Sequence, residues 1–350
     1  MTQQKFTPIS QLGENGLIKK IVNNFHNQHK STIKSMGDDA AVLFVNKDTS
    51  QLLTTDMLVE GIHFDPSYCP LKHVGYKAIV VNASDIYSMN GSPTHALISI
   101  AVPNKYSVES IQSIYEGVRL ACANYNIDLI GGDTTAISNN LVISITLIGE
   151  GKAGEITYRS GAKVNDLLVV SGNLGASYLG LQILEREKMI YEQNQKTQPV
   201  LDGYSELLER QLKPEARFDV INHLSQAQII PSSMIDISDG LSSECRHIAK
   251  ESNVGISIYE DKIPISDAAR KTAKELNLDP LVCALHGGED YELLFTVSTQ
   301  DFDKIKQIDS VTVIGHVTKN KDGVKLVGES GELVDLEKVS WDSFMKTKHI

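Results

Sequence analysis

The chain has 350 residues, of which 41% are hydrophobic and 22% charged, and its formal net charge is −11. This length allows two domains that each bury a core. The negative charge disfavours nucleic acid or an anionic membrane as the main partner. A phosphate substrate stays compatible with that charge, because divalent cations can lie between carboxylates and phosphates.

The sequence also bears on the compartment. No apolar run reaches the length of a membrane span, and the first residues, MTQQKFTPIS, lack the apolar core of a signal peptide. The four cysteines are scattered without the paired spacing of a zinc site or a redox pair. We therefore expect a cytoplasmic protein without disulfides, and neither nucleic acid nor membrane as a partner.

Hydrophobic periodicity predicts a mixture of helices and strands in the first part of the chain. In chain order these are a helix at 13–25, strands at 40–45 and 51–59, a helix at 74–90, a strand at 95–102, a helix at 107–125, and strands at 127–132 and 140–150. Strands and helices thus alternate without a repeat of solenoid length.

After residue 151 the pattern restarts, which places a domain boundary near residue 150 and predicts domains at 1–150 and 151–350. A polar stretch at 187–203 is predicted to be a surface excursion. The other elements expected here are strands at 167–172, 234–238, 255–260 and 292–297, and helices at 175–184, 214–226, 241–252 and 266–277.

Acidic residues recur beside small residues where apolar runs end. In MIDISDGL, the alternation of a buried strand places Asp236 and Ser238 on its other face, and Asp239 follows directly. Buried carboxylates are costly unless a cation, a donor network or a catalytic duty holds them. Further acids in this context are Asp38, Asp39, Asp56, Asp85, Asp133, Glu289 and Asp290.

These motifs favour a magnesium site over independent structural features. Thr54, Thr55 and Asp56 can offer hydroxyl, carbonyl and carboxylate oxygens from one strand end, as Mg²⁺ prefers. Taken singly, each motif fits a turn or a helix N-cap, but the recurrence is difficult to explain as independent caps. Because the sequence contains no GxxxxGK[ST] loop, bound phosphate would depend on metal ions.

Two basic residues are candidates for substrate contacts. His63 lies close in sequence to the Thr-Thr-Asp cluster and suits a polar contact, although a lone histidine near a strand end is as often structural. Arg159 in TYRSGAK is a candidate phosphate clamp, since guanidinium pairs bidentately with phosphate. A solvated surface charge is the alternative for a single arginine.

Taken in order, the motifs GDDAAV, TTDMLVEGIHF, NASDIYSMNGSP, GGDTT, IDISDGL and GGEDYELLF resemble those of the thiamine-monophosphate kinases. That family belongs to a superfamily with aminoimidazole ribonucleotide synthetase and selenophosphate synthetase. The resemblance extends over nearly the whole chain. TTDxLVEGxHF together with GGEDYEL separates this family from its relatives better than a single Gly-Asp pair does.

The resemblance implies an α+β fold of two α/β domains. The N-terminal domain would bind ATP and Mg²⁺ through a mixed sheet that pairs in a homodimer, and helices would cover the C-terminal sheet. It implies transfer of the γ-phosphoryl group of ATP to thiamine monophosphate, which yields thiamine diphosphate and ADP. No residue is expected to act as a covalent nucleophile.

The resemblance also implies a role for each matching residue. Several Mg²⁺ ions would be held by Asp38, Thr54, Thr55, Asp56, Asp85, Asp133, Asp236 and Asp239. ATP would contact Tyr115, Gly132, Arg159 and Ser238. The thiamine moiety would face His63, Glu289 and Trp341.

The chain departs from the family pattern at Val164-Asn165-Asp166, where Pro-Gly commonly precedes the Asp; Asn165 can replace that glycine because Asn tolerates a left-handed turn. The stretch 187–203 resembles an insertion.

Other activities fit parts of the pattern. Another ATP-dependent phosphate-transfer enzyme of the superfamily is the nearest alternative, but selenophosphate synthetases carry a reactive Cys or equivalent near the N-terminus, and the first cysteine here is Cys69. A non-catalytic Mg²⁺-nucleotide sensor is a further alternative, which the full set of acids disfavours. Release of ADP that depends on thiamine monophosphate separates enzyme from sensor.

Overall fold

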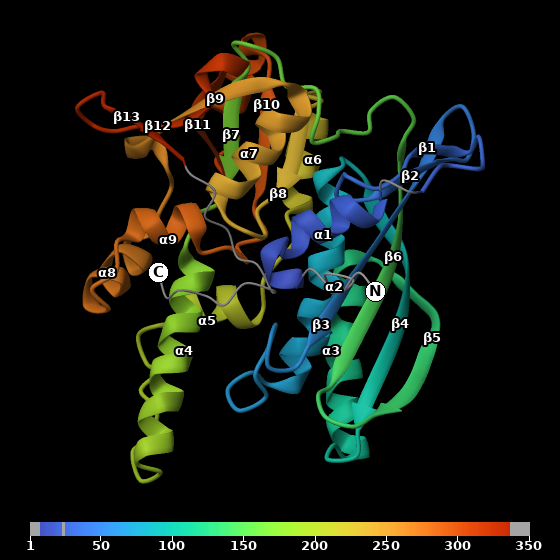
Figure 1. Ribbon diagram of the computed structural model, residues 1–350, viewed down its shortest axis with the longest axis vertical. Coiled ribbons are helices and arrows are strands. Elements are labelled where there is room, and N and C mark those ends of the chain that lie inside the picture. Colours follow the sequence, from blue (N-terminus) through green and yellow to red (C-terminus); the bar gives the residue numbers. More distant parts are fainter. Residues whose placement is uncertain (1–7, 23–24, 337–350) are drawn as a thin grey trace, which may run out of the picture.

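Figure 1 shows the computed structural model of the chain, which describes residues 8–22 and 25–336. Two mixed β-sheets, one from each part of the chain, are accompanied by helices, which confirms the predicted α+β class with two domains. Helix α1 Gly13–Val22 and a short 3₁₀ turn at Ile9–Gln11 precede the first sheet.

The first sheet has six strands in the order β1-β2-β3-β6-β4-β5, and of its neighbouring pairs only β4 and β5 are parallel. Side chains along β3 alternate in burial, as a sheet with one covered face requires. The strands are β1 Thr32–Lys34, β2 Ala41–Phe44, β3 Thr49–Val59, β4 Ser92–Pro103, β5 Asp128–Ile137 and β6 Val142–Lys152.

Helix α2 Leu71–Ser88 lies between the two domains and packs against β3, β4 and β6 of the first sheet and β8 of the second. Helix α3 Val108–Tyr125 crosses α2 closely, because a Cβ on Gly75 would lie 1.9 Å from the carbonyl oxygen of Ile114. Polar residues on α2 can therefore reach the junction between the domains.

The second sheet has seven strands in the order β13-β12-β9-β11-β7-β10-β8, and only its β9 and β12 neighbours are parallel. Helix α7 buries Leu241, Cys245 and Ile248 against one face. On the other face, Met234 and Phe295 join the core of the first domain. The strands are β7 Leu167–Ser171, β8 Ser233–Asp236, β9 Val254–Tyr259, β10 Leu293–Val297, β11 Val311–Lys319, β12 Val324–Val327 and β13 Leu333–Asp335.

The described helices of this domain include three that were not predicted, α5, α9 and α10. Figure 1 shows α4 projecting from the body of the molecule. The helices are α4 Ala176–Gln193, α5 Ser205–Leu212, α6 Phe218–Gln226, α7 Leu241–Ser252, α8 Asp267–Glu275, α9 Pro280–His286 and α10 Phe302–Ile305, and short 3₁₀ turns lie at Glu260–Lys262, Thr299–Asp301 and Asn320–Asp322.

The polar stretch 187–203 is partly helical, because α4 continues to Gln193. The buried Glu187 accepts a hydrogen bond from the backbone of Val200 at 2.8 Å, which folds the stretch back on the helix. Lys188 pairs with Asp65 of the first domain at 2.5 Å. At the departure from the family pattern, Asn165 has the predicted left-handed backbone, with φ +76°.

Candidate active site

Three carboxylates from different elements converge at the junction between the domains. Asp39 precedes β2, Asp85 lies on α2 and Asp236 ends β8, and an oxygen from each lies within 4.8 Å of the others. Asp39 and Asp236 are buried and Asp85 is half-buried. Helix capping and turn formation do not explain this convergence, because the acids come from three separate segments.

A hydroxyl group holds each carboxylate. The donors are Thr54 to Asp85 at 2.6 Å, Ser84 to Asp236 at 2.6 Å and Ser88 to Asp39 at 2.8 Å. Ser84, Asp85 and Ser88 lie on one stripe of α2, where helical spacing brings them side by side. A rigid helix therefore supplies much of the framework of the cluster.

Burial and mutual repulsion disfavour the ionised acids. Burial, with the charge of Asp39 added, raises the pKa of Asp236 to about 7. Burial and then the charges of Asp56 and Asp236 raise the pKa of Asp85 well above its usual range. A divalent cation would remove this repulsion, and carboxylates with hydroxyl neighbours are the ligands that Mg²⁺ prefers. The residues present fit a magnesium site.

Arg159, the predicted phosphate clamp, lies beside this cluster. Its Nε donates to Asp39 Oδ1 at 2.9 Å, and a second donor of the guanidinium contacts the same oxygen. Its backbone N–H donates to Asp38 Oδ1 at 3.0 Å, and Asp38 Oδ2 lies 3.2 Å from Lys34 Nζ. Asp38, the predicted ligand, thus orients the Arg159 backbone, while its neighbour Asp39 belongs to the three-acid cluster.

The other predicted metal ligands surround the cluster at different depths. Burial raises the pKa of Asp56, whose carboxyl group bonds that of Asp85. Asp239 follows β8, and its backbone N–H donates to buried Glu244 at 3.0 Å. Thr55 on β3 is exposed and donates to a backbone carbonyl, and Asp133 is exposed on β5.

The residues predicted to contact ATP besides Arg159 come from α3, from β5 and from the loop after β8. Tyr115 lines an open groove of about 500 Å³ between α3 and β5, together with Arg119 and Asn126. Gly132 lies on β5 where a Cβ would stand 1.8 Å from the carbonyl oxygen of Ile98, so that no side chain fits. Ser238 is exposed just beyond the end of β8.

The predicted thiamine-facing residues form a second polar group. His63 Nδ1 accepts a hydrogen bond from the backbone of Val59 at 3.0 Å, so the neutral ring carries its proton on Nε2. Burial lowers the pKa of His63, although the nearby Glu289 charge opposes this. Glu289 is held by Lys77 at 2.9 Å and by Gln211 at 3.0 Å. Trp341 lies outside the described residues.

The loops that carry the two ends of the site are bonded to each other. The backbone N–H of Glu289 donates to the carbonyl of Ser238 at 2.7 Å, and that of Tyr291 donates to Ile237 at 2.9 Å. The GGEDY loop and the IDISD loop are therefore a single structural unit, which fixes Glu289 relative to the acid cluster.

The sequence interpretation listed Asp39 among the acids but gave it no role, and it did not single out Lys77, Gln211 or Glu244. The motif GDDAAV contains two adjacent acids, and only the fold determines which one enters the cluster. Lys77 had a usable signal, since it precedes Ser84 and Asp85 by seven and eight residues and so falls on the same stripe of α2.

Within residues 8–22 and 25–336, the helices lack the combination of length and apolar character that a membrane span requires.

The two domains are those of the AIR synthase related proteins. The N-terminal domain of that family matches residues 37–150 and its C-terminal domain matches residues 163–327.

Within this class, the chain is 36% identical to the thiamine-monophosphate kinase of Bacillus subtilis over 322 residues, which covers 90% of this chain and 95% of the relative. It is 37% identical to that of Aquifex aeolicus over 327 residues, with coverage of 93% and 97%. The chain belongs to the thiamine-monophosphate kinase family, as its motifs predicted.

A solved structure described as AaThiL complexed with AMPPCP and TMP has a TM-score of 0.82 and 34% identity, and covers 96% of this chain and 99% of that one. A hydrogenase maturation protein, HypE in complex with ATP, shares the fold with a TM-score of 0.65 at 17% identity.

Proposed function

We propose that this protein catalyses ATP-dependent phosphorylation of thiamine monophosphate to thiamine diphosphate. The observation that carries the proposal is the cluster of Asp39, Asp85 and Asp236, joined through bonded loops to the group around Glu289. Membership of the thiamine-monophosphate kinase family supports it. The related structure with AMPPCP and TMP supports the pairing of a nucleotide with a thiamine phosphate.

The chemistry requires charge neutralisation more than a strong base. An oxygen of the thiamine monophosphate phosphate attacks the γ-phosphorus of ATP, the bond from that phosphorus to the bridging oxygen breaks, and ADP leaves with the electron pair. Both reactants are anions, so positioning and electrostatic stabilisation dominate. Mg²⁺, when bound, supplies positive charge to the phosphates.

Asp39, Asp85 and Asp236 are the residues that would hold Mg²⁺ most directly. Arg159 lies where its guanidinium can bind a phosphate while Asp39 keeps it oriented. Neutral His63 can donate from Nε2 to the substrate, and Glu289 can accept from the thiamine moiety. The remaining proposed ligands are Asp38, Thr54, Thr55, Asp56, Asp133 and Asp239 for Mg²⁺, Tyr115, Gly132 and Ser238 for ATP, and Trp341 for thiamine.

The proposal includes a homodimer that pairs through the first sheet. Strand β5 forms the edge of this sheet, and its ten residues are all exposed. A wide apolar surface on a sheet edge is typical of a subunit interface. The exposed apolar residues of the sheet include Met57, Leu97, Leu129, Ile130 and Ile137. A cytoplasmic location is also proposed, and the use of ATP and four free cysteines support it.

A coupled assay of ADP release tests the activity. With ATP and Mg²⁺ present, ADP should form only when thiamine monophosphate is added, and thiamine diphosphate should appear in equal amount. Omission of Mg²⁺ or replacement of the substrate by unphosphorylated thiamine should abolish turnover. Saturable ATP binding without turnover under these conditions would instead identify a nucleotide sensor.

A further inference from the structure

We propose that Lys77 and Gln211 are positioning residues for Glu289. Lys77 comes from the first domain and Gln211 from the second, and together they hold the Glu289 carboxylate in the orientation that recognises the thiamine moiety. The inference rests on the proposed function, and it adds residues for which the family resemblance gave no role. It is carried by the contacts of Glu289, the burial of Lys77 and the framework behind the GGEDYEL loop.

Lys77 is the partner from the first domain. Its Nζ lies 2.9 Å from Glu289 Oε1, and its side chain is 4% exposed whereas that of Glu289 is 31% exposed. A buried ammonium group requires an ion partner, so Lys77 is committed to this contact. The more exposed carboxylate keeps access to a ligand. Lys77 also lies about 12 Å along α2 from Asp85, on the basis of the helical rise per residue.

Gln211 is the partner from the second domain. Its Nε2 donates to Glu289 Oε2 at 3.0 Å, while its Oε1 accepts from the hydroxyl of Ser177 at 2.6 Å. The hydroxyl donor fixes which end of the amide faces Glu289, because the amide nitrogen can only donate. Both oxygens of Glu289 are thus occupied from opposite sides, which leaves the carboxylate little rotational freedom.

The backbone of this loop is held in unusual conformations. Glu289 and Tyr291 have φ values of +56° and +51°, in the left-handed region that costs energy for residues other than glycine. Such strain persists only where surrounding contacts fix it, and it is concentrated at functional sites. The direction of the Glu289 side chain therefore depends on what anchors the loop.

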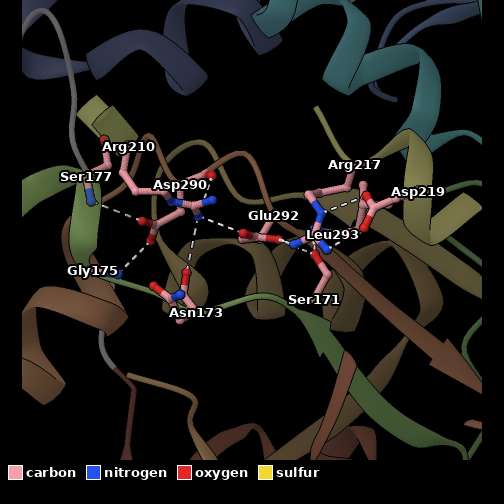
Figure 2. A network of polar contacts seen from close by, with 10 residues as sticks. All are labelled: Ser171, Asn173, Gly175, Ser177, Arg210, Arg217, Asp219, Asp290, Glu292 and Leu293. Atoms are coloured by element: carbon pink, nitrogen blue, oxygen red, sulfur yellow. Dashed lines mark hydrogen bonds and ion pairs between the residues drawn. The ribbon is translucent and has the colours of Figure 1, made fainter. Parts of the chain in front are cut away.

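Figure 2 shows that anchor, a buried network behind the loop. Asp290 accepts from the backbone N–H of Gly175 at 2.8 Å, at the start of α4. Arg210, next to Gln211 on α5, donates to the backbone carbonyl of Asp290 at 3.1 Å and to Glu292 at 2.7 Å. Arg217 pairs with the other side of Glu292 (Figure 2). Gln211 is therefore attached to the same framework as the residue that it orients.

The charge balance also defines how Glu289 acts. Because Lys77 already pairs with it, the carboxylate is an oriented hydrogen-bond acceptor rather than an unpaired counter-charge. A thiamine moiety offers hydrogen-bond donors on its aminopyrimidine ring, which a fixed acceptor can select. Loss of either partner should weaken recognition of this part of the substrate and leave the nucleotide end unaffected.

The test measures KM for each substrate in Lys77→Met and Gln211→Leu. Each variant should raise the KM for thiamine monophosphate about tenfold or more, as loss of a charged hydrogen bond does, while the KM for ATP changes less than about twofold. The matched control is Lys72→Met on the same helix, whose partner is the half-exposed Glu116 at 2.7 Å, and it should behave as wild type. Equal changes in both KM values would overturn the inference.

A double-mutant cycle with Glu289→Gln separates positioning from general damage to the fold. If Lys77 acts through Glu289, adding Lys77→Met to Glu289→Gln should cause little further loss, and independent action should multiply the two losses. Multiplied losses would overturn the proposal. If Lys77→Met fails to fold, the same cycle with Gln211→Leu decides. A wild-type protein inactive with thiamine monophosphate would overturn the proposed function itself, whereas active wild type with unaffected variants would overturn only this inference.

Discussion

The substitution Asp236→Asn should increase the stability of the metal-free protein and at the same time abolish most of its activity. The change removes a charge but keeps the shape and an acceptor for the Ser84 hydroxyl. Asp236 is 4% exposed, and burial together with the charge of Asp39 raises its pKa from 3.8 to about 7. That rise corresponds to about 4 kcal/mol of unfavourable ionisation in the folded protein, as an upper limit.

The pH dependence follows from the direction of this shift. Because the folded pKa lies above the unfolded value of 3.8, the penalty is absent below about pH 4, grows as the pH rises, and is complete above about pH 7. In EDTA, the free energy of unfolding of the wild-type protein should therefore fall as the pH rises from about 4 to about 7, and that of the variant should fall less. At pH 8 the variant should unfold at a temperature roughly 5 °C higher.

Activity should change in the opposite direction, because the same charge is needed for Mg²⁺. Turnover of the variant should fall about 100-fold or more at saturating Mg²⁺. Mg²⁺ should raise the melting temperature of the wild type more than that of the variant. The exposed Asp48→Asn is a matched control that should change neither property. A variant less stable than wild type in EDTA at pH 8 would refute the repulsion argument, and normal turnover would refute the role of Asp236.

Three further outcomes are expected. Asp56→Asn should keep the fold and lose turnover by about 100-fold or more, since its carboxyl group adjoins that of Asp85, and kinetics at saturating Mg²⁺ check this. The wild-type protein should be a dimer by light scattering, and Ile130→Glu on β5 should yield monomers; an unchanged dimer mass would contradict the proposed interface. Trp341→Ala should weaken binding of thiamine monophosphate about tenfold and leave ATP affinity unchanged. Because this tryptophan is unique in the chain, its fluorescence should shift when thiamine monophosphate is added, and unchanged emission at saturation would indicate a different role.

The sequence predicted those helices and strands whose hydrophobic pattern matches the faces that they bury in the structure. Strand β3 alternates in the sequence because only one face of its sheet is covered. Helix α2 has a long apolar run because it is buried on nearly all sides. Asn165 was predicted from turn chemistry, which depends on local backbone preference alone. Helix α5 was missed since eight residues carry too little periodicity to identify a helix.

Contacts of the site between residues that are distant in sequence could be identified only from the fold. The carboxylate of Asp290 bonds a backbone N–H that lies 115 residues earlier, and no local pattern encodes that contact. The same holds for Asp38 and Asp39, which are adjacent in the sequence while their partners in space differ. A motif identifies the segment that enters a site, and tertiary packing selects the side chain.

Helix α2 explains why one substitution should affect one end of the site and not the other. Its stripe carries Lys77 near the start and Ser84, Asp85 and Ser88 further along, so the proposed thiamine end and the proposed phosphate end share a rigid element. A substrate with its phosphate at the acids and its rings at Glu289 must lie along this helix. Because a helix keeps the two ends at a fixed separation, a change at Lys77 reorients Glu289 without displacing Asp85. We therefore expect mutations to separate the proposed binding of thiamine from the proposed charge neutralisation of the phosphates, although residues of the same helix contribute to both.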